Sequence, residues 1–139
     1  MTKNAKVFNS FLASKEVKPD VNETEDDTRF TLHYNLKGGP NVRIVCIFDE
    51  DDTMVRLYFF DYINSVDESK KAKIYEVINK INLEYTYVKF VIDDDNDVYA
   101  SYFVTVNNNF DSQIIFNLML TISEIMEEKY PAFMKVVWA

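Results

Sequence analysis

Two apolar runs joined by an acidic turn dominate the hydrophobic pattern of the chain. Residues 42–48 and 55–63 each alternate between two sets of side chains, which is the period-two repeat of a β-strand. The Asp-Glu-Asp-Asp stretch at 49–52 lies between these runs and favours a solvent-exposed turn. The pattern therefore predicts a β-hairpin in the middle of a sheet.

Two further stretches predict the remaining strands. Residues 30–36 alternate between apolar and polar positions, and the Gly-Gly-Pro-Asn turn at 38–41 leads from them into the central hairpin, giving a three-strand meander. Residues 85–92 and 98–106 flank an acidic turn and predict a second hairpin. We expect the acidic segment 20–27 to be a loop.

Apolar residues at helical spacing predict two helices before the last strand. The first surrounds residues 7–12 and buries a narrow stripe. The second starts at Ser65 and Glu68, which have the spacing of a capping box. We expect it to end near Asn82, a residue that tolerates the left-handed conformation of a C-cap.

The final helix is predicted to be the most apolar, with Asp111 as its N-cap. Phe116, Met119 and Leu120 widen its apolar stripe beyond what one sheet face covers, so the first helix or another molecule must cover the rest. Pro131 suits the first turn of a short additional helix.

Together these elements predict a two-layer α+β domain that spans residues 1–139, in the order helix, three strands, helix, two strands, helix. The sheet should be mainly antiparallel, with five strands in the order 1-2-3-5-4. A helical crossover from strand three returns strand four parallel to it, which leaves room for strand five between them.

Composition narrows the classes of partner. The net charge of −8 opposes binding to phosphate backbones, so we expect no nucleic-acid partner. No apolar run approaches membrane-spanning length, and we expect no membrane association. The single Cys46 cannot form an internal disulfide, which favours a reducing, cytoplasmic location.

Catalytic chemistry has little support in the pattern. The only histidine, His33, lies on the polar side of its strand, whereas Cys46 lies on the apolar side of the next strand. These positions leave no nucleophile paired with a base. We therefore expect a protein that is not an enzyme, with no catalytic residues and no cofactor.

An acidic turn in the second predicted hairpin is the one pattern with metal-ligand character. Asp93, Asp95 and Asp97 resemble the first ligands of a Ca²⁺ loop. However, Val98 occupies the position of the required glycine and Val104 that of the bidentate acid. We expect no metal site here.

Two short motifs and the element order resemble the bacterial YbjN family. The run Ile-Asn-Lys-Ile-Asn at 78–82 precedes Tyr-Val-Lys-Phe at 87–90, and Tyr-Pro at 130–131 precedes a last apolar segment. The chain departs from the family in having Asn96 and Asp97 where a glycine is common. The resemblance implies a fold similar to that of type III secretion chaperones, which are small, acidic, usually dimeric proteins that bind partner polypeptides without catalysis.

The sheet face opposite the helices is the candidate binding site. If all helices cover one face, as in the resembled fold, the other face is basic and aromatic on an acidic protein. Its predicted partner-binding residues are Arg43, Val45, Ile47, Arg56, Tyr58, Phe60, Tyr62, Tyr87 and Lys89, with Tyr99 and Phe103 as possible further members. Tyrosine and arginine dominate binding hot spots.

Two functions remain open from the sequence. The first is a chaperone-like or regulatory interaction module that binds a protein partner, or a second copy in a homodimer, through the open sheet face and the last helix. The alternative is a regulatory domain that senses a small ligand held between sheet and helices. It also remains open that a helix covers the candidate face, or that its tyrosines and arginines only shield a solvated surface.

Overall fold

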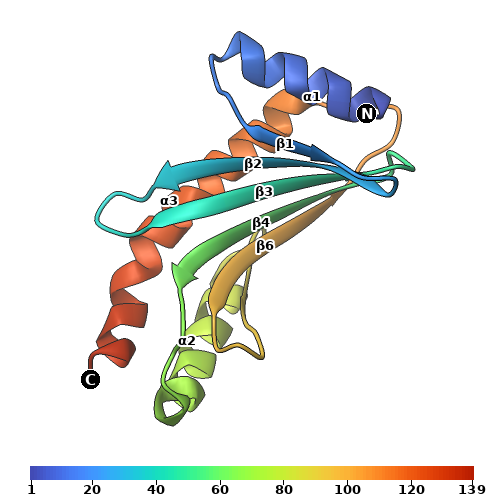
Figure 1. Cartoon of the computed structure of the whole chain (residues 1–139). Coiled ribbons are helices and arrows are strands. Elements are labelled where there is room, and N and C mark those ends of the chain that lie inside the picture. The colour runs from blue at the N-terminus through green and yellow to red at the C-terminus, as the bar shows by residue number, and fades with distance from the viewer.

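The computed structural model describes residues 1–139 and places a sheet against three helices (Figure 1). The strands are β1 (Asp20–Glu23), β2 (Asp27–Asn35), β3 (Asn41–Asp49), β4 (Met54–Ile63), β5 (Lys89–Ile92) and β6 (Val98–Thr105). The helices are α1 (Lys3–Ser14), α2 (Lys71–Glu84), which follows the 3-10 turn η1 (Glu68–Lys70), and α3 (Ser112–Val137). All neighbouring strands are antiparallel, in the order β1-β2-β3-β4-β6-β5.

The predicted order of the five expected strands is confirmed, but the prediction of five strands is wrong. The segment expected to be a loop contains β1, a sixth strand at the edge of the sheet. All four of its residues are exposed, so their side chains carry no alternating burial signal. Backbone pairing to β2 holds the strand, with Val21 opposite Phe30 and Asn22 opposite Arg29.

The start of α2 differs from the predicted capping box. Asp67 is the cap of the preceding 3-10 turn, because its carboxylate accepts a hydrogen bond from the amide of Ser69 at 3.1 Å. Ser65 instead adopts a positive φ of 56° and donates its backbone N–H to Asp97 at 2.7 Å. Ser65 therefore holds the turn before β6 and does not cap α2, contrary to the prediction from the sequence pattern.

The two predicted helix boundaries at Asn82 and Pro131 are also wrong. α2 continues to Glu84, and the side chain of Asn82 contacts β5. Pro131 lies inside a continuous α3. A proline there removes one helical hydrogen bond, but the turn beyond it buries Phe133 completely, and that packing offsets the loss. Asp111 is the N-cap of α3 as predicted, accepting from the amide of Gln113.

The core lies between the sheet and the helices, which all cover one face. Phe8 of α1 packs against Phe30 and Phe48, with ring centroids 5.4 and 5.3 Å apart. At the other end, Phe133 of α3 packs against Tyr62 and Phe90. In Figure 1, α3 runs behind the strands and the opposite face of the sheet carries no element. The fold is therefore α+β with an open sheet face, as the sequence predicted.

Candidate interaction face

Strand register identifies the residues on the open sheet face. Arg43 lies opposite Phe60, and Val45 lies opposite Tyr58. Because successive side chains alternate between faces, these residues point away from the helices, whereas Cys46 and its neighbours in register point toward them. The predicted choice of faces for the central hairpin is therefore correct.

Four aromatic rings form a contiguous group on this face, which we call the open-face cluster: Tyr58, Phe60, Tyr99 and Phe103. Tyr58 stacks on Phe60 with centroids 5.2 Å apart and ring planes 9° apart. Tyr99 packs 5.2 Å from Phe60, and Phe103 packs 5.5 Å from Tyr58. Partial burial raises the pKa of Tyr99, with a smaller contribution from Tyr58. The cluster is only partly shielded, since 46% of Phe103 is exposed.

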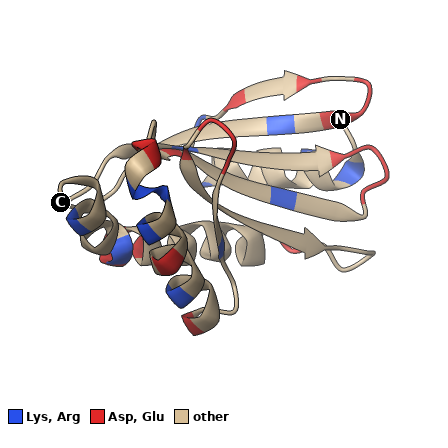
Figure 2. Ribbon diagram, turned by 90° about the horizontal axis from the view of Figure 1, so that it is seen from below, with Lys and Arg blue, Asp and Glu red and all other residues tan.

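Basic side chains border the open-face cluster. The guanidinium of Arg43 lies 5.0 Å from the ring centroid of Phe60, a cation–π geometry, and it also contacts Asp61 at 3.2 Å. Arg56 lies opposite Phe103 in the ladder. Figure 2 shows that Asp and Glu gather mainly in the turns that connect the strands. The open face is therefore more basic than the molecule as a whole.

Lys89 extends this border onto β5. It lies opposite Ser101, which in turn lies opposite Tyr58 on β4. Tyr87 precedes β5 and packs edge-on against Tyr102 at 5.9 Å. Tyr102 alternates to the helix-covered side, so Tyr87 does not join the open-face cluster.

Tyr62 is not on the open face, and its predicted assignment is wrong. Only 3% of it is exposed, and its hydroxyl donates to the carbonyl of Met126 in α3 at 2.7 Å. The cause is an irregularity in the β4–β6 ladder, in which register shifts between Phe59 and Ile63. Asp61 there has a φ of 63°, and this local bulge turns Tyr62 into the core.

Val45 and Ile47 face the open side but are already covered within the monomer. They are 6% and 5% exposed. In register, Ile47 lies between Arg29 and Arg56, whose long aliphatic stems cover apolar surface while their charges stay in water. Val45 and Ile47 consequently offer little additional apolar area to a partner, although the sequence predicted both as partner-binding residues.

The only histidine and the only cysteine lie on opposite faces of the sheet. His33 is opposite Arg43 on the open side. Cys46 is fully buried, and its thiol lies 3.6 Å from the sulfur of Met119. Burial raises the pKa of the Cys46 thiol. The two side chains therefore do not form a nucleophile–base pair.

The turn between β5 and β6 brings three carboxylates together. Ligand atoms of Asp93, Asp95 and Asp97 lie within 4.8 Å of one another. One oxygen of Asp93 accepts from the amides of Asp95 and Asp97, and Asp97 accepts from the amide of Ser65. These hydrogen bonds account for the cluster as turn structure.

The last helix is covered in part by the first. Phe116 of α3 packs 5.6 Å from Phe11 of α1, and Met119 is buried. Leu120 is 41% exposed and borders an apolar cavity of about 270 Å³ between α3 and strands β2 and β3. The first helix therefore covers part of the widened stripe, and the part around Leu120 stays uncovered within the chain.

The fold and this face define a small α+β protein with an uncovered aromatic sheet surface. The chain belongs to the YbjN family, because the sequence model of that family matches residues 4–133 and is described as "Putative bacterial sensory transduction regulator". One similar solved structure is described as "Crystal structure of YbjN, a putative transcription regulator from E. coli".

That structure covers 92% of each chain with 15% sequence identity and a TM-score of 0.60. At this identity the likeness establishes the shared fold. No curated protein matches the sequence. None of the helices is long and apolar enough to cross a membrane.

Proposed function

We propose that this protein is a non-enzymatic interaction module, chaperone-like or regulatory, that binds a partner polypeptide through the open sheet face and the last helix. The observation that carries the proposal is the open-face cluster, a contiguous aromatic group bordered by Arg43, Arg56 and Lys89 and covered by no element. The regulator description of the family agrees with a non-catalytic role.

The energetic support comes from the aromatic side chains. Burying apolar surface stabilises a complex by about 25 cal/mol per Å². Because Val45 and Ile47 are already covered, this gain would come chiefly from Phe60 and Phe103. Arg43 and Arg56 can pair with acidic groups of the partner at the border, which improves specificity and association rate more than affinity.

The position of α3 constrains the shape of the partner. The open-face cluster and the exposed α3 residues Ile114 and Leu120 lie on opposite sides of the sheet. A partner that contacts both must pass around an edge of the sheet. An extended polypeptide can do this, whereas a flat, rigid surface cannot.

A second candidate function is the sensing of a small ligand, which the cavity beside α3 favours. Its lining is mostly apolar, including Leu32, Tyr34, Ile44 and Phe116. The polar group of Ser123 in this lining already donates to the carbonyl of Met119 at 2.7 Å. Because small-molecule sites need convergent polar groups for specificity, the cavity supports this function less than the open face supports protein binding.

The proposal is tested by Phe60→Asp, with Tyr75→Asp on α2 as matched control because Tyr75 is an exposed aromatic residue away from the sheet face. We expect affinity capture from native cells to recover a polypeptide with the wild type and with Tyr75→Asp, but not with Phe60→Asp. Circular dichroism should show that both variants remain folded. Equal capture by all three proteins would contradict the open-face site.

Sedimentation equilibrium separates a homodimer from a complex with another protein. If the open face joins two copies, the wild type and Tyr75→Asp should be dimers and Phe60→Asp a monomer. A monomeric wild type with Phe60→Asp unfolded would show that Phe60 supports the core and not a contact surface.

A further inference from the structure

The two edges of the sheet differ in whether their backbone is already paired. At the β5 edge, the side chain of Asn82 accepts a hydrogen bond from the amide of Phe90 at 2.8 Å and donates one to its carbonyl at 3.1 Å. The side chain of Asn82 thus occupies the outward-facing backbone groups of Phe90. Blocking these groups disfavours the pairing of another strand with this edge.

The β1 edge is open. All of its residues are exposed, and it pairs with β2 on one side only. The amide of Thr24 donates to the carbonyl of Asp27 at 2.8 Å, and hydrogen-bonded pairs alternate along an antiparallel ladder. Counting back from this pair, Asn22 is bonded to β2, whereas Val21 and Glu23 direct their N–H and C=O groups outward.

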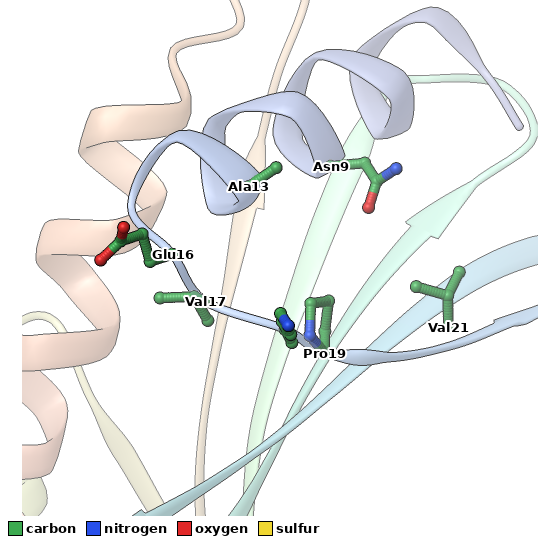
Figure 3. A pocket seen from close by; sticks show the side chains of 7 residues that line it. Asn9, Ala13, Glu16, Val17, Pro19 and Val21 are labelled. Atoms are coloured by element: carbon green, nitrogen blue, oxygen red, sulfur yellow. The ribbon is translucent and has the colours of Figure 1, made fainter.

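A hollow of about 560 Å³ lies beside this edge, between β1 and α1. Figure 3 shows Asn9 and Ala13 of α1 on one side, and Val17, Pro19 and Val21 on the other. Val21 is 43% exposed. A strand added to β1 would direct alternate side chains into this hollow, where small or apolar ones fit against Ala13, Val17 and Val21. The charged Glu16 and Lys18 also line it.

The charge around β1 selects the chemistry of such a strand. Residues 16–27 contain six acidic side chains and one basic one. Asp20 lies opposite Thr31 and therefore faces the open side of the sheet. Basic side chains alternating with apolar ones would thus meet Asp20 on one side and the hollow on the other, while Glu23 faces the helix side and pairs with the N-terminal ammonium at 2.8 Å.

A second copy of this chain is a poor occupant. Pairing two β1 strands would bring two copies of the acidic segment 16–27 within one strand spacing, about 4.8 Å. Like charges on paired strands are destabilising. Each copy also carries a net charge of −8.

We propose that the β1 edge binds an extended, basic segment of another polypeptide as an additional strand, through the outward backbone groups of Val21 and Glu23 and the hollow beside α1. This inference deepens the proposed function, on which it rests for the class of partner. A partner that contacts both sides of the sheet would then pass around the β1 edge, because Asn82 pairs with the backbone at the other edge.

The test uses a fluorescein-labelled peptide that alternates Lys and Val, with binding measured by fluorescence anisotropy. We expect Val21→Pro to weaken binding about tenfold, because proline removes an outward N–H and is tolerated at a sheet edge. Val21→Thr keeps that N–H and should bind within about twofold of the wild type. Methylating alternate amides of the peptide should also abolish binding without any change to the protein.

Amide hydrogen exchange by NMR reports on the mode of binding. On addition of the Lys-Val peptide, exchange should slow at Val21 and Glu23 and stay unchanged at Asn22, which is already bonded to β2. In Val21→Pro, protection of the Asn22 amide shows whether β1 remains paired. If β1 has detached in Val21→Pro, that variant is uninformative, and binding of the methylated peptide to the wild type tests whether the peptide pairs with β1.

Several outcomes would overturn the proposal. These are equal binding to the wild type and a folded Val21→Pro, binding of the methylated peptide, equal binding of a Glu-Val peptide, or no binding at all. Phe60→Asp separates this edge from the open face. If Phe60→Asp still binds the Lys-Val peptide, the edge site is supported. If Phe60→Asp also captures the cellular partner normally, only the open-face proposal is contradicted.

Discussion

The hydroxyl of Tyr62 donates a 2.7 Å hydrogen bond to the carbonyl oxygen of Met126, joining β4 to α3 across the core. Burial raises the pKa of Tyr62, so the phenol stays protonated and able to donate throughout the range in which the protein would be studied. The bond also lies one turn before Pro131, the position at which α3 lacks a backbone donor.

Replacing Tyr62 by Phe should therefore lower the free energy of unfolding by about 0.5–1.5 kcal/mol, the usual net value of one buried hydrogen bond. Urea denaturation followed by circular dichroism measures this change. Tyr58→Phe, which removes a hydroxyl on the open face, is the control and should be nearly neutral. A neutral Tyr62→Phe would show that water replaces the bond.

Cys46 should be unreactive in the folded protein. Its thiol is fully buried, and burial raises its pKa, so almost no thiolate forms at mildly alkaline pH. Ellman's reagent should label it only after denaturation. Rapid labelling of the native protein would mean that the sheet and α3 separate often at Met119.

Asn82→Ala should destabilise the protein by about 1–3 kcal/mol, because it leaves two backbone groups of Phe90 without their partner. Asn82→Asp should be milder, since a carboxylate still accepts from the amide but cannot donate to the carbonyl. Asn79→Ala, at an exposed position of α2, is the matched control. Thermal melting of the three variants orders them, and equal effects of the two alanine substitutions would contradict a specific role for Asn82.

Asp27 should make stability depend on acid pH. Its pKa is lowered, mainly by the hydrogen bond from Arg29 and also by that from Thr24. Since the folded-state pKa lies below the unfolded value of about 3.9, the stabilisation is present above that pH and is lost as pH falls through the folded pKa. The side chain of Asp27 is 8% exposed and that of Arg29 is 48% exposed, so solvent screens the pair in part. Asp27→Asn should therefore cost about 1 kcal/mol at neutral pH, the upper end for surface ion pairs.

The measurement is urea denaturation of the wild type and Asp27→Asn at neutral pH and near pH 2. The two stabilities should converge in acid. A difference that persists there would assign the effect to packing of the β1–β2 turn and not to the carboxylate charge.

Strand order was predictable from the sequence because connection lengths and crossover rules constrain it. Hairpins force neighbours to be antiparallel, and the crossover through α2 leaves one place for β6. β1 was not predictable in the same way. Its four side chains are all exposed, and backbone pairing leaves no trace in a hydrophobic pattern.

The candidate face was predictable only where alternation continues. Phe60 and Arg43 lie where the period-two pattern places them. Tyr62 does not, because the bulge at Asp61 breaks the alternation, and an aspartate that tolerates positive φ was the only local hint. The coverage of Val45 depends on its cross-strand neighbours Thr31 and Tyr58, and the alternation within one strand carries no information on how well such neighbours cover it.

The bulge in β4 has a consequence for how this strand tolerates substitution. Along a regular strand, positions that tolerate a polar substitution alternate with positions that do not, because successive side chains point to the solvent and to the core. Here Phe60 and Asp61 both lie outside the core, and Tyr62 and Ile63 both lie within it. Polar substitutions should therefore affect stability in adjacent doublets at this point, little at Phe60 and Asp61 and strongly at Tyr62 and Ile63, so that only the open-face cluster, and not the core, restricts Phe60.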